Sequence, residues 1–174
     1  ASLKEEKFKI NTNLDDGISI GSTLKDYSSK MNNLTEQFRS IAQIANERKD
    51  NIEREDFKNL EQINKITKKI EQNSNQINSL STQLVGKQYT LKNLQSTYNE
   101  LKNNLESVIK KSSASIEVNE ALLETEISVL QKDINETSEN LVAFNEDLHK
   151  WQKDVTKTEG LVFELNRDLD EANI

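Results

Sequence analysis

Apolar residues recur at alternating intervals of three and four along almost the whole chain after residue 20. Such spacing averages 3.5 residues, which places the apolar side chains in one stripe of a helix that winds around another helix. The chain has no proline, so no residue forbids a long uninterrupted helix. Only 33% of its residues are hydrophobic and 30% are charged, which supplies one narrow seam rather than a broad core. The sequence therefore predicts an all-α, long coiled-coil fold.

Three runs carry this spacing, over residues 20–52, 63–108 and 123–172. Joining the first two needs four extra residues near Ile52–Phe57, a stutter that locally unwinds a coiled coil. The register of the second and third runs differs by one residue across the serines of 112–115. The seam and interface residues that we expect to be buried against another helix are Leu24, Tyr27, Met31, Leu34, Phe38, Ile41, Leu84, Leu101, Phe144, Leu148 and Trp151.

Charge favours an antiparallel helical hairpin, in which about 57–111 pairs with 117–172 through a turn near 112–116. Residues 57–116 carry nine basic and four acidic side chains, whereas residues 117–174 carry five basic and fifteen acidic ones. Opposite charges on neighbouring helices attract, and a parallel pairing of two copies would align the acidic stretch with itself. That parallel pairing of one continuous helix with its copy remains the alternative.

Reflection of the seam about residue 114 predicts the pairs within the hairpin. It places Tyr98 beside Leu130 and Ile66 beside Val162. Because both seams repeat every seven residues, they can be paired in antiparallel fashion about many centres, spaced half a heptad apart. The seam alone therefore does not determine which centre the hairpin uses. The choice of residue 114 depends on the position of the serines.

The first nineteen residues differ from the rest. Residues 7–11, Lys-Phe-Lys-Ile-Asn, alternate polar and apolar types, so we expect residues 1–19 to be a loosely ordered leader or a short β-segment. Thr23-Leu24-Lys25-Asp26 is similar to a capping box and predicts that a helix over about 22–56 starts there. Residues 20–174 then form one elongated coiled-coil domain. Since the hairpin leaves helix 22–56 without an intramolecular partner, we expect a homo- or hetero-oligomer through residues 20–56.

We expect no catalytic, cofactor-binding or metal-binding residues. The single histidine, His149, follows a seam residue and should face solvent, and the chain has no cysteine. Two polar residues, Asn73 and Lys87, occupy seam positions. Such residues usually fix the register or the number of helices at some cost in stability, so we expect Asn73 and Lys87 to set the register.

The expected partners are proteins, in the form of another helix or coiled coil. A sequence pI of about 4.9 argues against nucleic acid, and no apolar run is long enough to span a membrane. The leading hypothesis is a non-enzymatic structural scaffold that mediates protein–protein interaction and oligomerisation in a cytoskeletal, chromosome-segregation or tethering assembly. The alternative is the helical-hairpin domain of a bacterial secreted effector, translocator or pore-forming toxin, which such a hairpin resembles in shape alone. An intracellular location, in the cytoplasm or cytoskeleton, is favoured, and secretion is the alternative.

Overall fold

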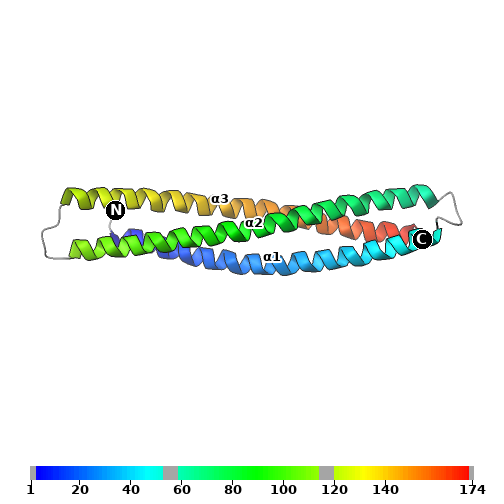
Figure 1. Ribbon diagram of the computed structural model, residues 1–174, viewed down its shortest axis with the longest axis horizontal. Coiled ribbons are helices and arrows are strands. Elements are labelled where there is room, and N and C mark those ends of the chain that lie inside the picture. The colour runs from blue at the N-terminus through cyan, green and yellow to red at the C-terminus, as the bar shows by residue number, and fades with distance from the viewer. Residues whose placement is uncertain (1–2, 53–58, 114–119, 173–174) are drawn as a thin grey trace. The chain divides into compact units, whose positions relative to one another are not determined.

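A computed structural model describes residues 3–52, 59–113 and 120–172 of the chain, and almost all of them are α-helical (Figure 1). Helix α1 spans Leu3–Ile52, α2 spans Asn59–Ser113 and α3 spans Glu120–Glu171. The described ranges contain no strand. The predicted all-α fold is therefore confirmed, and so is the hairpin-like packing of α2 on α3.

The chain divides into two compact units. Unit 1 consists of Ala1–Leu24 and Gly86–Leu148, and unit 2 consists of Lys25–Val85 and His149–Ile174. Parts of all three helices contribute to each unit, and within each unit these parts lie side by side (Figure 1). In both units α2 runs antiparallel to α3, because residue numbers rise along α2 as they fall along the contacting segment of α3. Helix α1 runs antiparallel to α2 in unit 1, and in unit 2 residue numbers rise together along α1 and α3.

The heptad pattern forms the core of each unit. Along α3, every third or fourth residue from Leu130 to Leu169 is buried, while the residues between them are exposed or half-buried. The same alternation holds along α2 from Ile63 to Val108, with the exceptions of three half-buried seam positions, Ile70, Lys87 and Leu94. Burial of one apolar stripe per helix is the main favourable term that holds such helices together.

The prediction for residues 1–19 is wrong, because α1 begins at Leu3. The alternation in residues 7–11 does not mark two faces of a strand: Ile10 is fully buried, whereas Phe8 is 71% exposed. Thr23 does not cap a helix either, since its hydroxyl donates to the Ser19 carbonyl 3.2 Å away, inside α1. The seam runs back from Leu24 in steps of four and three. Its earlier positions are Ile20, Gly17, Asn13, Ile10, Glu6 and Leu3.

The expectation that helix 22–56 lacks an intramolecular partner is also wrong. In unit 2, Met31, Leu34 and Phe38 of α1 are buried within the chain, and the Tyr27 ring lies against Trp151 of α3. In unit 1, the side chain of Gln95 on α2 donates to the carbonyl of Gly17 on α1. The seam of α1 is thus covered by α2 and α3, and oligomerisation is not needed to bury it.

The register of the hairpin differs from the reflection about residue 114. In unit 1 the Tyr98 hydroxyl lies near the Ser138 hydroxyl, whereas the reflection places Leu130 beside Tyr98. In unit 2 Ile66 and Leu169 line one hollow, whereas the reflection places Val162 beside Ile66. The midpoints of these two pairs, 118 and 117.5, lie about half a heptad beyond 114. The seam allows a hairpin centre in every half repeat, so the ends of the two helices determine which centre is used. Helix α2 ends at Ser113 and α3 begins at Glu120, and the midpoint of these two residues lies between 116 and 117, closer to the observed centre than to residue 114.

Two predicted features lie wholly or partly outside the described residues. Ser112 and Ser113 close α2, where the Ser112 hydroxyl donates to the Ile109 carbonyl at 2.9 Å, and the remainder of the predicted turn, 114–116, lies outside. The predicted stutter lies outside apart from Ile52, the last residue of α1, and so does the end of the predicted helix 22–56 beyond that residue.

Candidate interaction surfaces

The predicted seam residues are part of the core of this chain. Nine of them are buried, and Tyr27 and Ile41 are half-buried. The buried nine are Leu24, Met31, Leu34, Phe38, Leu84, Leu101, Phe144, Leu148 and Trp151. Since these side chains already contact helices of the same chain, a surface for other proteins has to come from the outer faces.

Trp151 anchors unit 2. Its indole N–H donates to the Leu80 carbonyl on α2 at 3.1 Å, and its ring centroid lies 5.4 Å from that of Tyr27 on α1. The indole is 2% exposed, so its polar atom needs this partner. One side chain on α3 therefore fixes both neighbouring helices.

The two predicted register-setting residues differ in their surroundings. Asn73 is buried, and its amide donates to the Leu161 carbonyl on α3 over 3.4 Å. Lys87 is only half-buried. Asn73 thus joins α2 to α3 by a long hydrogen bond from inside the seam.

A cluster of polar side chains from all three helices lies in unit 1. The Asn13 amide of α1 donates to the Ser138 hydroxyl of α3 at 2.6 Å. The hydroxyl of Tyr98 on α2 is buried near Ser138 without a hydrogen bond of normal geometry. Burial raises the pKa of Tyr98 above its ordinary value of 10.0, the nearby Ser138 hydroxyl opposes this rise, and the Asp16 carboxylate adds to it. Sequence reasoning missed this cluster because Asn13 lies in the segment predicted to be a leader.

Ion pairs join α3 to its neighbours in both units. Lys111 of α2 pairs with Glu126 at 3.4 Å in unit 1, and Lys69 of α2 pairs with Asp168 in unit 2. Lys30 of α1 lies 4.0 Å from Glu159. The two pairs between α2 and α3 have the signs that the arm charges predict, a basic α2 and an acidic α3. Each is partly exposed, so it favours this pairing of helices more than it stabilises the fold.

Unit 2 has a groove of about 640 Å³ between α1 and α3, which is lined by apolar side chains together with polar ones such as Lys30, Gln37 and Glu159. The buried Leu34 and Val162 line it together with the half-buried Ile41. Two exposed side chains border it, Ile44 at 40% and Phe163 at 68%. Phe163 lies outside the heptad stripe. The sequence contains a signal for this, because only Val162 of the run Leu161-Val162-Phe163 is needed for the seam and the other two apolar residues are extra.

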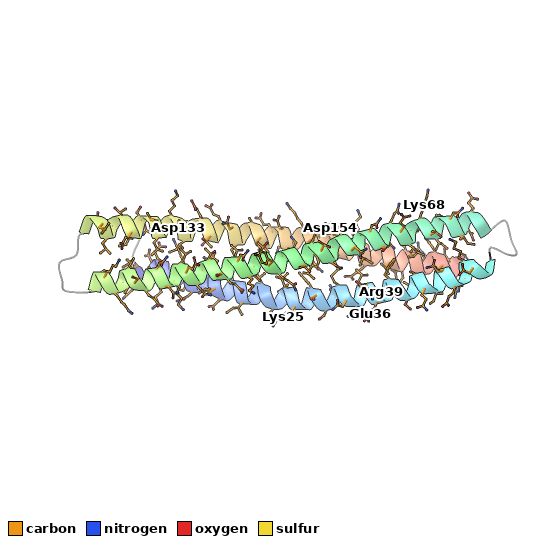
Figure 2. All side chains as sticks on the ribbon, in the orientation of Figure 1. Lys25, Glu36, Arg39, Lys68, Asp133 and Asp154 are labelled. Atoms are coloured by element: carbon orange, nitrogen blue, oxygen red, sulfur yellow. The ribbon has the colours of Figure 1, made fainter. Side chains whose placement is uncertain are left out.

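Elsewhere the outer faces carry many charged side chains together with exposed apolar ones, among them Phe8, Val85 and Tyr89. Figure 2 shows Lys25, Glu36 and Arg39 on the side of α1 that points away from the other helices, and all three are exposed. A smaller groove of about 370 Å³ lies between α2 and α3 in unit 1, with the half-exposed Val129 beside it. In these two grooves exposed apolar side chains border a hollow between two helices, so they are the candidate surfaces.

His149 is exposed, as expected. Within the described residues, no three His, Cys, Asp or Glu side chains gather closely enough to hold a metal ion. None of the described helices contains an apolar stretch that would cross a membrane.

The chain was compared with protein-family models, with curated proteins and with solved structures. None of the three comparisons gives a match. The outer faces of the helices are therefore the basis for a functional proposal.

Proposed function

We propose that the protein is a non-enzymatic helical scaffold that binds other proteins and oligomerises within a cytoskeletal, chromosome-segregation or tethering assembly. The observation that carries this proposal is the aromatic side chain of Phe163, 68% exposed beside the groove between α1 and α3 although the seam of its helix is filled without it. Aromatic side chains are enriched at protein interfaces, where a few of them contribute most of the binding energy.

The groove also supports oligomerisation by a different route from the one that the sequence suggested. The seam residues Met31, Leu34 and Phe38 are buried inside the chain, but side chains of the same segment, from Lys30 to Ile44, line the groove with α3. Burial of Phe163 by a partner would contribute about 1.5–3 kcal/mol. A helix of another chain is the element whose ridge of side chains fits such a groove.

Sedimentation velocity combined with affinity isolation tests the proposal. The chain is expected to form a complex of defined stoichiometry, with its own copies or with an identified protein. Phe163→Ser should weaken this complex about tenfold or more, since about 1.4 kcal/mol corresponds to a factor of ten. Val85→Ser is the matched control, because Val85 is also in unit 2 and 65% exposed but does not line the groove.

Two results would contradict the proposal. One is a chain that forms no complex of defined stoichiometry at any concentration or with any protein. The other is a complex that Phe163→Ser and Val85→Ser weaken to the same extent, because binding would then not depend on the groove.

A further inference from the structure

We infer that the groove between α2 and α3 in unit 1 binds a helix of another protein with one face both basic and apolar. This inference rests on the proposed scaffold function and specifies the chemistry of a partner. The groove has a volume of about 370 Å³, and the buried side chains of Val108 on α2 and Leu130 on α3 line it. Val129 borders it with 54% of its surface exposed.

One face of α3 combines apolar and acidic side chains at this groove. Leu122, Glu126, Val129, Asp133 and Glu136 follow one another at intervals of four and three, so they share a face of the helix. Leu122 is 58% exposed, and Asp133 and Glu136 are exposed as well. A helix that covers Val129 would therefore bring its own side chains next to these carboxylates.

The charges at the two ends of the groove are not equivalent. At one end Lys111 neutralises Glu126. At the other end Asp133 lines the groove, and among the described residues no basic side chain forms an ion pair with it. The side chains of α2 that line the groove, apart from Lys111, are Asn104, Ser107 and Val108, none of which carries charge. Figure 2 shows Asp133 on the part of α3 that lies beside α2.

The wider surroundings have the same sign. Residues 120–148 of α3 contain eight acidic residues and one basic residue, a net charge of −7. This charge repels nucleic acid and anionic membranes, and it attracts a basic partner. A second copy of this chain, whose own net charge is also −7, is a poorer match than a basic helix. Charge complementarity therefore selects the occupant, and the apolar side chains provide the area that it buries.

The test uses the full chain and a synthetic peptide of three heptads, with leucine at positions a and d and lysine at e and g. Repulsion among its lysines keeps this peptide from pairing with itself. The wild-type chain should bind the peptide more weakly as salt rises, because exposed charges contribute to the complex. It should not bind a peptide with glutamate in place of lysine.

Four substitutions at exposed positions locate the binding. Val129→Ser should weaken binding about fivefold through lost apolar burial, and Asp133→Asn about threefold through a lost ion pair. The controls lie thirteen residues further along α3, which is about 3.6 turns and so a different face of the same helix. They are Val142→Ser and Glu146→Gln, both at exposed positions, and they should change affinity less than twofold.

The outcomes separate this inference from the scaffold proposal. Equal weakening by all four substitutions would show general charge attraction and would overturn the inference, as would absence of binding. Self-association of the wild-type chain that Val129→Ser abolishes, as seen by sedimentation, would overturn it too. None of these results affects the Phe163→Ser experiment, which tests the scaffold proposal through a different groove. The two proposals can therefore fail separately.

Discussion

Several seam positions of this chain carry residues that a coiled coil does not usually place there. Glu6 is only 2% exposed, and one of its carboxylate oxygens has no hydrogen-bond partner, although Lys9 lies 3.7 Å from the other. Gly17 is buried, and Asn13 bonds to Ser138. These exceptions explain why the sequence indicated a leader over residues 1–19: the spacing of three and four continues there, but polar residues and glycine interrupt the apolar signal. Steps counted backward from Leu24 would have revealed the earlier positions.

The Tyr98 hydroxyl should make stability depend on pH at the alkaline end. Its raised pKa means that the folded state favours the neutral phenol. The stabilisation is therefore fully present below pH 10, the ordinary value, and is lost as the pH rises above it toward the folded pKa. Tyr98→Phe should remove this part of the decline and should change stability by less than about 1 kcal/mol at pH 8. Urea unfolding of both proteins between pH 8 and 11 measures it, and parallel curves would contradict the assignment.

Asn73 should lower stability while it fixes the register. Its hydrogen bond to the Leu161 carbonyl is long, at 3.4 Å, so it offsets little of the cost of burying an amide. Asn73→Leu is expected to raise the free energy of unfolding by about 1 kcal/mol and to permit other registers of α2 on α3. Cysteines at positions 69 and 168, the sites of an ion pair, report the register through the yield of a cross-link with a short bismaleimide. If Asn73→Leu lowers stability and leaves this yield unchanged, Asn73 has no such role.

At the scale of elements, the sequence was a good guide to the helices and a poor one to their alignment. The pairing of a basic helix with an acidic one follows from residue counts, and the ion pairs Lys111–Glu126 and Lys69–Asp168 agree with it. The centre of the hairpin was misplaced by half a heptad because a periodic seam matches at every such step. The outer grooves could not be predicted, since they depend on how α1 lies against α3 and α2 against α3.

Gly86 and Gly160 are sites at which the helices can be made more stable. Both lie inside helices, are exposed, and would place a Cβ atom in open space. Replacement by alanine should therefore raise the free energy of unfolding by about 0.5–1 kcal/mol at each site, because glycine loses more backbone freedom on folding. Gly86 belongs to unit 1 and Gly160 to unit 2, so the two gains should add. Urea unfolding of the single and double variants checks this, and a loss of stability in either single variant would contradict the packing.

At the scale of the whole molecule, each unit buries the seams of its three helical segments within one chain. The sequence supported a hairpin plus a helix in need of an external partner, because spacing alone does not distinguish an internal partner from an external one. The structure covers α1 internally, so the surface that the proposed partners would contact lies on the outer faces. The scaffold proposal and the inference about a basic helix both depend on this internal packing of α1.

One measurement tests that packing most directly. The chain has no cysteine, so Asn13→Cys with Ser138→Cys introduces one defined pair at the contact between α1 and α3 in unit 1. Oxidation in dilute solution should give a disulfide within one chain, seen by mass spectrometry and at monomer mass without reductant. Lys111→Cys with Glu126→Cys, joined by a short flexible bismaleimide because a Lys–Glu ion pair spans more than a disulfide does, serves as the control for α2 against α3. Two results would contradict this packing of α1. One is a 13–138 disulfide found only at dimer mass, and the other is no 13–138 disulfide while the control pair is joined within one chain.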